Sequence, residues 1–296
     1  MVGAVPALLA AVGFAGFQLI NRRALAGVDV YRGTATLLLV STVVLGVVSL
    51  VSGELSLVLE APARAILFCA AAGFVHFFFG WTLLGMAQIR VGAARAGIMV
   101  GTVPLFGALL AALLLDESLS AFDVTGLLLV VAGVGVVVSA RGAPPAGSQG
   151  SPAMGVLAGL ATAACWSLSP ILIRQGLEGL PSPVTGAGVG MAASAAGYGV
   201  LLLATHRVAA RQVVTSRTRR LLLVAGVAVG LSIWMQWTAF DLAPVAVVLT
   251  LLQLTPPLVV VFATRLAGEV LGPARYRVGI GTAVTVSGSL LLILTG

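Results

Sequence analysis

Ten apolar segments, each about 20 residues long, run through this chain of 296 residues. A run of that length matches the hydrocarbon thickness of a bilayer, where only helices or closed barrels satisfy their own backbone hydrogen bonds. The runs are too long and too uniform for the alternating strands of a barrel. Composition agrees, because 59% of residues are hydrophobic and only 8% are charged. The sequence therefore predicts an all-α integral membrane protein with ten transmembrane helices. The predicted spans are residues 4–21, 31–51, 63–88, 93–115, 123–140, 153–174, 183–204, 219–241, 244–266 and 276–295.

The charges and motifs exclude several classes of function. All 16 basic residues are arginine and produce a net charge of +7. They lie in short segments between the apolar spans rather than on one soluble face, which argues against nucleic-acid binding. The chain has no Walker-type phosphate loop, no HExxH motif and no Ser/His/Asp cluster in its loops, so we expect no enzymatic activity, no metal and no other cofactor. Cys69 and Cys165 lie in apolar segments and are interpreted as small hydrophobic residues. No basic stretch precedes the first apolar run, so a cleaved signal peptide is not expected.

The chain repeats one pattern at a constant distance. Pro104 and Pro256 lie 152 residues apart, and so do Phe14 and Trp166. A segment rich in Gly, Pro and Ser, residues 141–152, is the only stretch that resembles a linker. We therefore predict two homologous domains of five spans each, residues 1–140 and 153–296. Because five is an odd number, the second copy must enter the membrane from the opposite side, and the two copies form an inverted repeat. Such repeats are typical of secondary transporters, whose substrate site lies between them near the bilayer midplane.

Spans five and ten have the same glycine spacing. Gly126 and Gly133 correspond to Gly281 and Gly288 at a distance of 155 residues, because the second copy has three extra residues before this point. Small residues allow close approach of membrane helices. We expect these glycines to serve packing, either within the chain or between two chains, which leaves a monomer and a homodimer open.

The distribution of arginine predicts an orientation. Fourteen arginines lie in the odd-numbered loops and only Arg64 and Arg174 in the even-numbered ones. Cytoplasmic loops carry the excess of positive charge in membrane proteins. The arginines therefore place the odd-numbered loops in the cytoplasm and both termini outside.

Two long stretches resemble the repeats of the EamA-type transporters in the drug/metabolite transporter superfamily. The first is GMAQIRVGAARAGIMVGTVPLFGALLAALLLDESLS, followed by GLLLVVAGVGVV, and the second is TAFDLAPVAVVLTLLQLTPPLVVVFATRLAGEVLG. The resemblance implies a multi-pass carrier of the inner or plasma membrane, often an exporter of amino acids or other small metabolites. It also implies a cavity lined by the first four helices of each repeat. Family members are expected to have cytoplasmic termini, so the resemblance and the arginine distribution disagree on orientation.

Prolines and a histidine occupy the central parts of the spans. Pro104, Pro256 and Pro257 cannot donate a hydrogen bond to the carbonyl four residues earlier, so each kinks its helix. The kinks are candidates for gating, and a fixed packing kink is the alternative. His76 lies near the middle of span three and is the candidate for proton coupling, because ionisable residues inside a membrane are costly. A neutral histidine hydrogen-bonded between helices is the alternative.

Other polar and aromatic residues within the spans are candidates for contact with a substrate. An amide inside an apolar helix needs hydrogen-bond partners that a small polar substrate can supply, although bonds between helices explain it equally well. Tryptophan lines cavities but also anchors helices at the membrane interface or packs between them. The candidates are Phe14, Gln18, His76, Trp81, Trp166, Trp234, Trp237 and Gln253, and Gln236 is a further amide of this kind.

These observations together predict a secondary transporter that works by alternating access. Its partners would be the lipid bilayer and a small substrate, neutral or zwitterionic, because the midplane lacks arginine and carboxylate side chains. The alternative is a membrane sensor or scaffold that uses the same fold without transport.

Overall fold

The computed structural model describes residues 2–114, 120–139, 150–205, 214–268, 272 and 274–295. Within these ranges the chain is helical and contains no strand. Ten segments of this part of the chain are long and apolar enough to cross a membrane, which confirms the predicted spans. Glu117 and Glu269, which occupy equivalent positions in the two copies, and most of the predicted linker lie outside the described residues.

Seven spans are single helices. They are α1 (Ala4–Leu25), α2 (Val30–Val51), α8 (Ala121–Ser139), α9 (Pro152–Leu177), α10 (Pro183–Ala204), α11 (Ser216–Leu242) and α14 (Ala274–Thr295). Side chains cap several of their first turns, as helix N-termini require. The Asp29 carboxylate accepts from the backbone N–H of Tyr31 at the start of α2, and the Ser182 hydroxyl accepts from that of Thr185 in α10. A 3₁₀ turn (Glu54–Ser56) and the short α3 (Leu57–Glu60) follow α2.

The other three spans are interrupted. Span three consists of α4 (Ala63–Gly73), the π-helix η2 (Phe74–Trp81) and α5 (Thr82–Val91). Span four breaks at residues 101–102, between α6 (Ala93–Val100) and α7 (Val103–Leu114). Span nine breaks at residues 253–254, between α12 (Val245–Leu252) and α13 (Thr255–Phe262), and ends in the π-helix η3 (Ala263–Ala267). Both breaks directly precede the prolines at 104 and 256, where the loss of a backbone donor weakens the helix.

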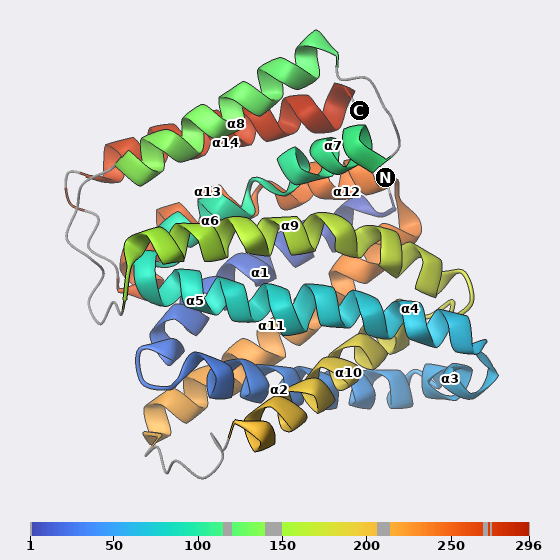
Figure 1. The fold of residues 1–296 in the computed structure, drawn as a ribbon. Coiled ribbons are helices and arrows are strands. Elements are labelled where there is room, and N and C mark those ends of the chain that lie inside the picture. Colours follow the sequence, from blue (N-terminus) through green and yellow to red (C-terminus); the bar gives the residue numbers. More distant parts are fainter. Residues whose placement is uncertain are drawn as a thin grey trace.

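Most of the main helix contacts have a counterpart when the two halves are exchanged. Helix α1 packs against α11, and its equivalent α9 packs against span three, which is the equivalent of α11. Likewise α2 packs against α11 and α10 against α4, while α2 with α10 and α8 with α14 pair with their own equivalents. This exchange symmetry is what two homologous, inverted repeats require. Figure 1 shows α8 and α14 side by side at one edge of the bundle, with the other helices forming the main body.

The glycines of α8 and α14 contact each other within the chain. A Cβ atom at Gly133 would lie 2.7 Å from the carbonyl oxygen of Gly281, and one at Gly126 would lie 3.0 Å from that of Gly288. Neither helix tolerates a side chain at these points, so the two backbones approach closely. The expected packing role is therefore realised between the two halves of one chain.

The two ends of the bundle differ in charge. Figure 1 shows that α1 begins and α14 ends at the same end, here called the termini end. The opposite end, where α1 ends and α2 begins, is here called the arginine end. Arg64 and Arg174 are the two arginines of the even-numbered loops, so they lie apart from the other arginines. Arg174 donates from Nη2 to the carbonyl oxygen of Ala243 at 2.9 Å, just past the C-terminus of α11. Arg64 lies over the Phe68 ring, 5.3 Å from its centroid. Both exceptions therefore have local partners that hold them.

Candidate functional site

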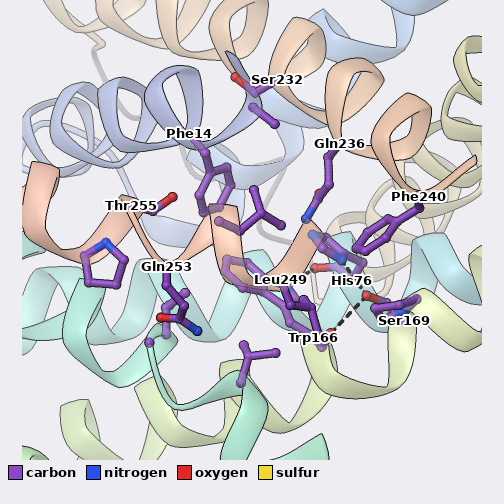
Figure 2. Close-up of a pocket in the computed structure, with 17 residues that line it drawn as sticks. Phe14, His76, Trp166, Ser169, Ser232, Gln236, Phe240, Leu249, Gln253 and Thr255 are labelled. Carbon is purple, nitrogen blue, oxygen red and sulfur yellow. Dashed lines mark hydrogen bonds between the residues drawn. The ribbon is translucent and has the colours of Figure 1, made fainter. Parts of the chain in front are cut away.

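A cavity lies between the two halves of the chain, next to the two broken spans. It contains about 630 Å³ of space outside the protein atoms, open solvent included. Its walls come from α1, η2, α9, α11, α12 and the breaks of spans four and nine, and Figure 2 shows their side chains converging. The lining residues are Ala10, Phe14, His76, Val100, Gly101, Val103, Trp166, Ser169, Pro170, Ser232, Gln236, Phe240, Leu249, Leu252, Gln253, Thr255 and Pro256.

Three rings form the cavity's aromatic floor, defined as Phe14, His76 and Trp166. The imidazole of His76 stacks on the Trp166 indole with centroids 5.0 Å apart and an interplanar angle of 14°. Phe14 meets the same indole edge-on at 5.2 Å. These are the favoured geometries for aromatic pairs, so each ring holds the others in place. Phe14 and Trp166 are equivalent positions of the two repeats, and they therefore meet across the boundary between them.

Hydrogen bonds fix the tryptophan and the histidine further. The indole Nε1 of Trp166 donates to the carbonyl oxygen of His76 at 2.9 Å, and the Nδ1 of His76 lies 2.8 Å from the hydroxyl oxygen of Ser169. His76 belongs to the π-helix η2, whose altered backbone register suits a carbonyl that bonds outside its own helix. Gly80, which lies in the same π-helix as His76, faces the indole of Trp166. A Cβ atom at Gly80 would overlap the indole Nε1. The π-helix and Gly80 together make room for Trp166.

Gln253 supplies an unpartnered acceptor to the cavity. Its side chain starts at the break of span nine and is 6% exposed, and its Oε1 has no hydrogen-bond partner among the described residues. A buried amide oxygen without a partner is destabilising, so a ligand that donates to it would bind favourably. Gly101, the equivalent residue in the first repeat, lies opposite, and a Cβ atom there would be 3.7 Å from this oxygen. The two repeats thus carry different residues, Gly101 and Gln253, at equivalent positions that face each other.

The lining as a whole is aromatic, apolar and uncharged. Its polar groups are an imidazole, the amides of Gln236 and Gln253, and hydroxyls, and no lining residue carries an aspartate, glutamate, arginine or lysine side chain. His76 is the only lining residue with an ionisable side chain. The site therefore suits a solute that is neutral or zwitterionic and has an apolar part.

Six of the sequence-predicted residues line the cavity, namely Phe14, His76, Trp166, Gln236, Gln253 and Pro256. Six others lie elsewhere: Gln18, Trp81, Trp234, Trp237, Pro104 and Pro257. Trp81 is buried against Phe17 and Phe77, at centroid distances of 5.5 and 5.0 Å. Trp237 is fully buried, and Trp234 packs at the edge of the core.

Sequence reasoning missed the cavity's hydroxyl groups, those of Ser169, Ser232 and Thr255. Serine and threonine are common in membrane helices because they bond to their own backbone, as Ser232 does to Ala228 at 2.6 Å. Thr255 had a usable signal, since it directly precedes the proline of the break and bonds to the Ala11 carbonyl of α1 at 3.3 Å.

Comparisons with known proteins agree with this architecture. One solved structure, described as "Crystal structure of protein", superposes with a TM-score of 0.63 at 22% identity, over 97% of this chain and 96% of its own. That likeness shows a shared fold. No curated protein matches the chain. Residues 1–139 match the model of the EamA-like transporter family. The N-terminal part of the chain thus matches the EamA-like transporter family of the drug/metabolite transporter superfamily, and ten apolar helices make the chain a multi-pass membrane protein.

Proposed function

We propose that this chain is a secondary transporter that exports small neutral or zwitterionic metabolites, such as amino acids or related compounds, across the cell membrane. The observation that carries the proposal is the uncharged cavity between the two halves. It combines an aromatic floor with the unpartnered Gln253 acceptor. The aromatic rings suit an apolar side chain, and the amide oxygen suits an ammonium or hydroxyl donor.

The geometry supports alternating access between two inverted domains, residues 1–140 and 153–296. The cavity reaches toward the termini end, because its α1 residues lie in the first half of that helix and its α11 residues in the last half. On the arginine side of the cavity, residues of α1 and α5 such as Gln18, Leu84 and Gln88 are fully buried. With the arginine end in the cytoplasm, this conformation is open toward the outside. Movement at the breaks of spans four and nine would reverse that access.

One chain contains a complete cavity, and the glycine faces of α8 and α14 already pack against each other. We therefore propose that the transporting unit is the monomer. His76 remains the candidate for proton coupling, through its contacts with Ser169 and Trp166.

Counterflow in proteoliposomes tests the proposal. A growth-inhibition screen of overexpressing cells against amino acids and analogues first narrows the candidates. Purified protein is then reconstituted with each candidate inside, and uptake of the labelled compound is measured. We expect exchange of neutral amino acids and none of lysine or glutamate. Absence of exchange for every compound, by protein that remains folded, would support the sensor or scaffold instead.

A matched pair of variants links flux to the cavity. Trp166→Ala removes the indole from the floor and its bond to the His76 carbonyl, so we expect strongly reduced exchange. Ile171→Ala changes the same helix at a position that is 55% exposed, and its flux should stay near wild type. Equal flux in both variants would contradict the assigned site.

A further inference from the structure

Three buried amide side chains form a cluster on the arginine side of the cavity. This amide cluster comprises Gln18, Asn21 and Gln88, with exposures of 0%, 2% and 0%. Gln18 and Asn21 lie four and seven residues after Phe14 and share its face of α1. Gln88 lies near the end of α5. The cluster therefore continues the line of the cavity beyond its aromatic floor, although none of its members lines the cavity itself.

The hydrogen bonding of the amide cluster is incomplete. Asn21 Nδ2 donates to Gln88 Oε1 at 2.9 Å, and Gln88 Nε2 donates to the backbone oxygen of Gln18 at 3.4 Å. Both polar atoms of the Gln18 side chain and the Oδ1 of Asn21 have no hydrogen-bond partner among the described residues. Buried polar groups are almost always bonded, so three unpartnered atoms in one cluster require an explanation. Packing alone does not explain them, because apolar side chains would fill the same space without this loss.

The repeat relation supplies the explanation. At the distance of 152 residues, Gln18 corresponds to Pro170 and Gln88 corresponds to Phe240. Both equivalents line the open cavity. Gly97, which faces Gln18 so that a Cβ atom would lie 3.6 Å from Oε1, corresponds to the lining residue Leu249. Two members of the cluster, Gln18 and Gln88, thus occupy in the first repeat positions that form the open wall in the second, whereas Asn21 corresponds to the buried Ile173.

We propose that Gln18, Asn21 and Gln88 form a second substrate-contact site, closed in this conformation and opened toward the arginine end when the two repeats exchange conformations. The inference rests on the proposed transport function. The unpartnered donor and acceptor atoms would bind a small uncharged or zwitterionic solute that both donates and accepts hydrogen bonds. The aromatic floor separates this site from the open cavity, so the solute contacts the two sites in turn.

Thiol accessibility tests the opening. Cys69 and Cys165 are replaced by alanine, and Gln88→Cys is introduced alone, with Gln18→Cys as a second position. A membrane-impermeant, negatively charged methanethiosulfonate is applied to the arginine end of the protein in oriented proteoliposomes. We expect the labelling rate at both positions to rise about tenfold when a transported amino acid is cycling. Gln236→Cys, which replaces a cavity residue, should label from the termini end instead.

A second readout tests contact with the solute. Gln18→Leu removes two unpartnered atoms and should raise the apparent KM measured from the arginine end by about three- to tenfold, the value of one hydrogen bond. The KM from the termini end should change less than twofold. Unaltered labelling during cycling, or equal KM changes at both ends, would overturn the inference while wild-type flux persists. Absence of wild-type flux would contradict the proposed function and this inference together.

Discussion

Replacement of Gln253 by leucine should change stability and substrate affinity in opposite directions. The buried Oε1 of Gln253 has no partner among the described residues, and such an atom costs about 1–3 kcal/mol. Leucine has a similar volume and removes that cost. Each kcal/mol shifts the unfolding midpoint of a protein this size by about 2–4 °C, so Gln253→Leu should raise the midpoint by about 2–12 °C.

The same substitution removes the acceptor that we assign to the substrate. A hydrogen bond to a charged donor such as an ammonium is worth about 1.5–3 kcal/mol, which corresponds to a rise in KM of about 10- to 150-fold. Counterflow in proteoliposomes measures that rise with the best substrate of the amino-acid panel. A thiol-reactive dye measures the unfolding midpoint, because Cys69 is fully buried in the folded protein.

Two comparisons make this result interpretable. Leu254→Ala alters the neighbouring residue, which is 44% exposed, and should leave KM unchanged. Gln253→Asn keeps an amide but shortens it, so KM should lie between wild type and Gln253→Leu. A lower midpoint together with an unchanged KM for Gln253→Leu would refute the reasoning, because Gln253 would then be a structural residue with a partner.

Three further predictions concern the proton, the helix packing and the orientation. His76→Gln should flatten the dependence of flux on pH, since glutamine does not titrate; an unchanged pH profile of counterflow would exclude proton coupling through His76. Gly133→Ala should lower the unfolding midpoint, because the new Cβ would lie 2.7 Å from the Gly281 carbonyl oxygen, and such overpacking costs about 1–3 kcal/mol. Gly135→Ala, whose Cβ meets nothing within 4 Å, should not lower it, and equal losses in the two variants would contradict the close packing of α8 and α14. A phosphatase that is active only outside the cytoplasm should be active when fused after Gly296, whereas activity of a cytoplasm-specific reporter there would show that the arginine distribution misassigns the orientation.

The ten spans were predictable because each is a long apolar run, and lipid leaves the backbone few alternatives. The breaks at residues 101–102 and 253–254 directly precede Pro104 and Pro256, where the missing donor is visible in the sequence itself. The π-helix that contains His76 was not predicted. No residue type marks it, and it coincides with tertiary contacts, namely the Trp166 bond to a backbone carbonyl and the close approach of Gly80.

The cavity was predictable only in part. Phe14 and Trp166 could be found because they occupy equivalent positions of the repeat. Trp237 could not be placed, because the apolar residues of α11 are not confined to one face, so its sequence does not say which face meets the cavity. Gln18 was expected to contact substrate, and the structure buries it beyond the aromatic floor. The sequence includes the residues that serve each conformation of the proposed transport cycle, whereas one structure shows a single conformation.

Counterflow of neutral amino acids by purified protein in proteoliposomes tests the central claim most directly. The account predicts saturable exchange by wild type, strongly reduced exchange by Trp166→Ala, and wild-type exchange by Ile171→Ala. Folded wild-type protein that exchanges none of the panel, or Trp166→Ala protein that exchanges as fast as wild type, would contradict it.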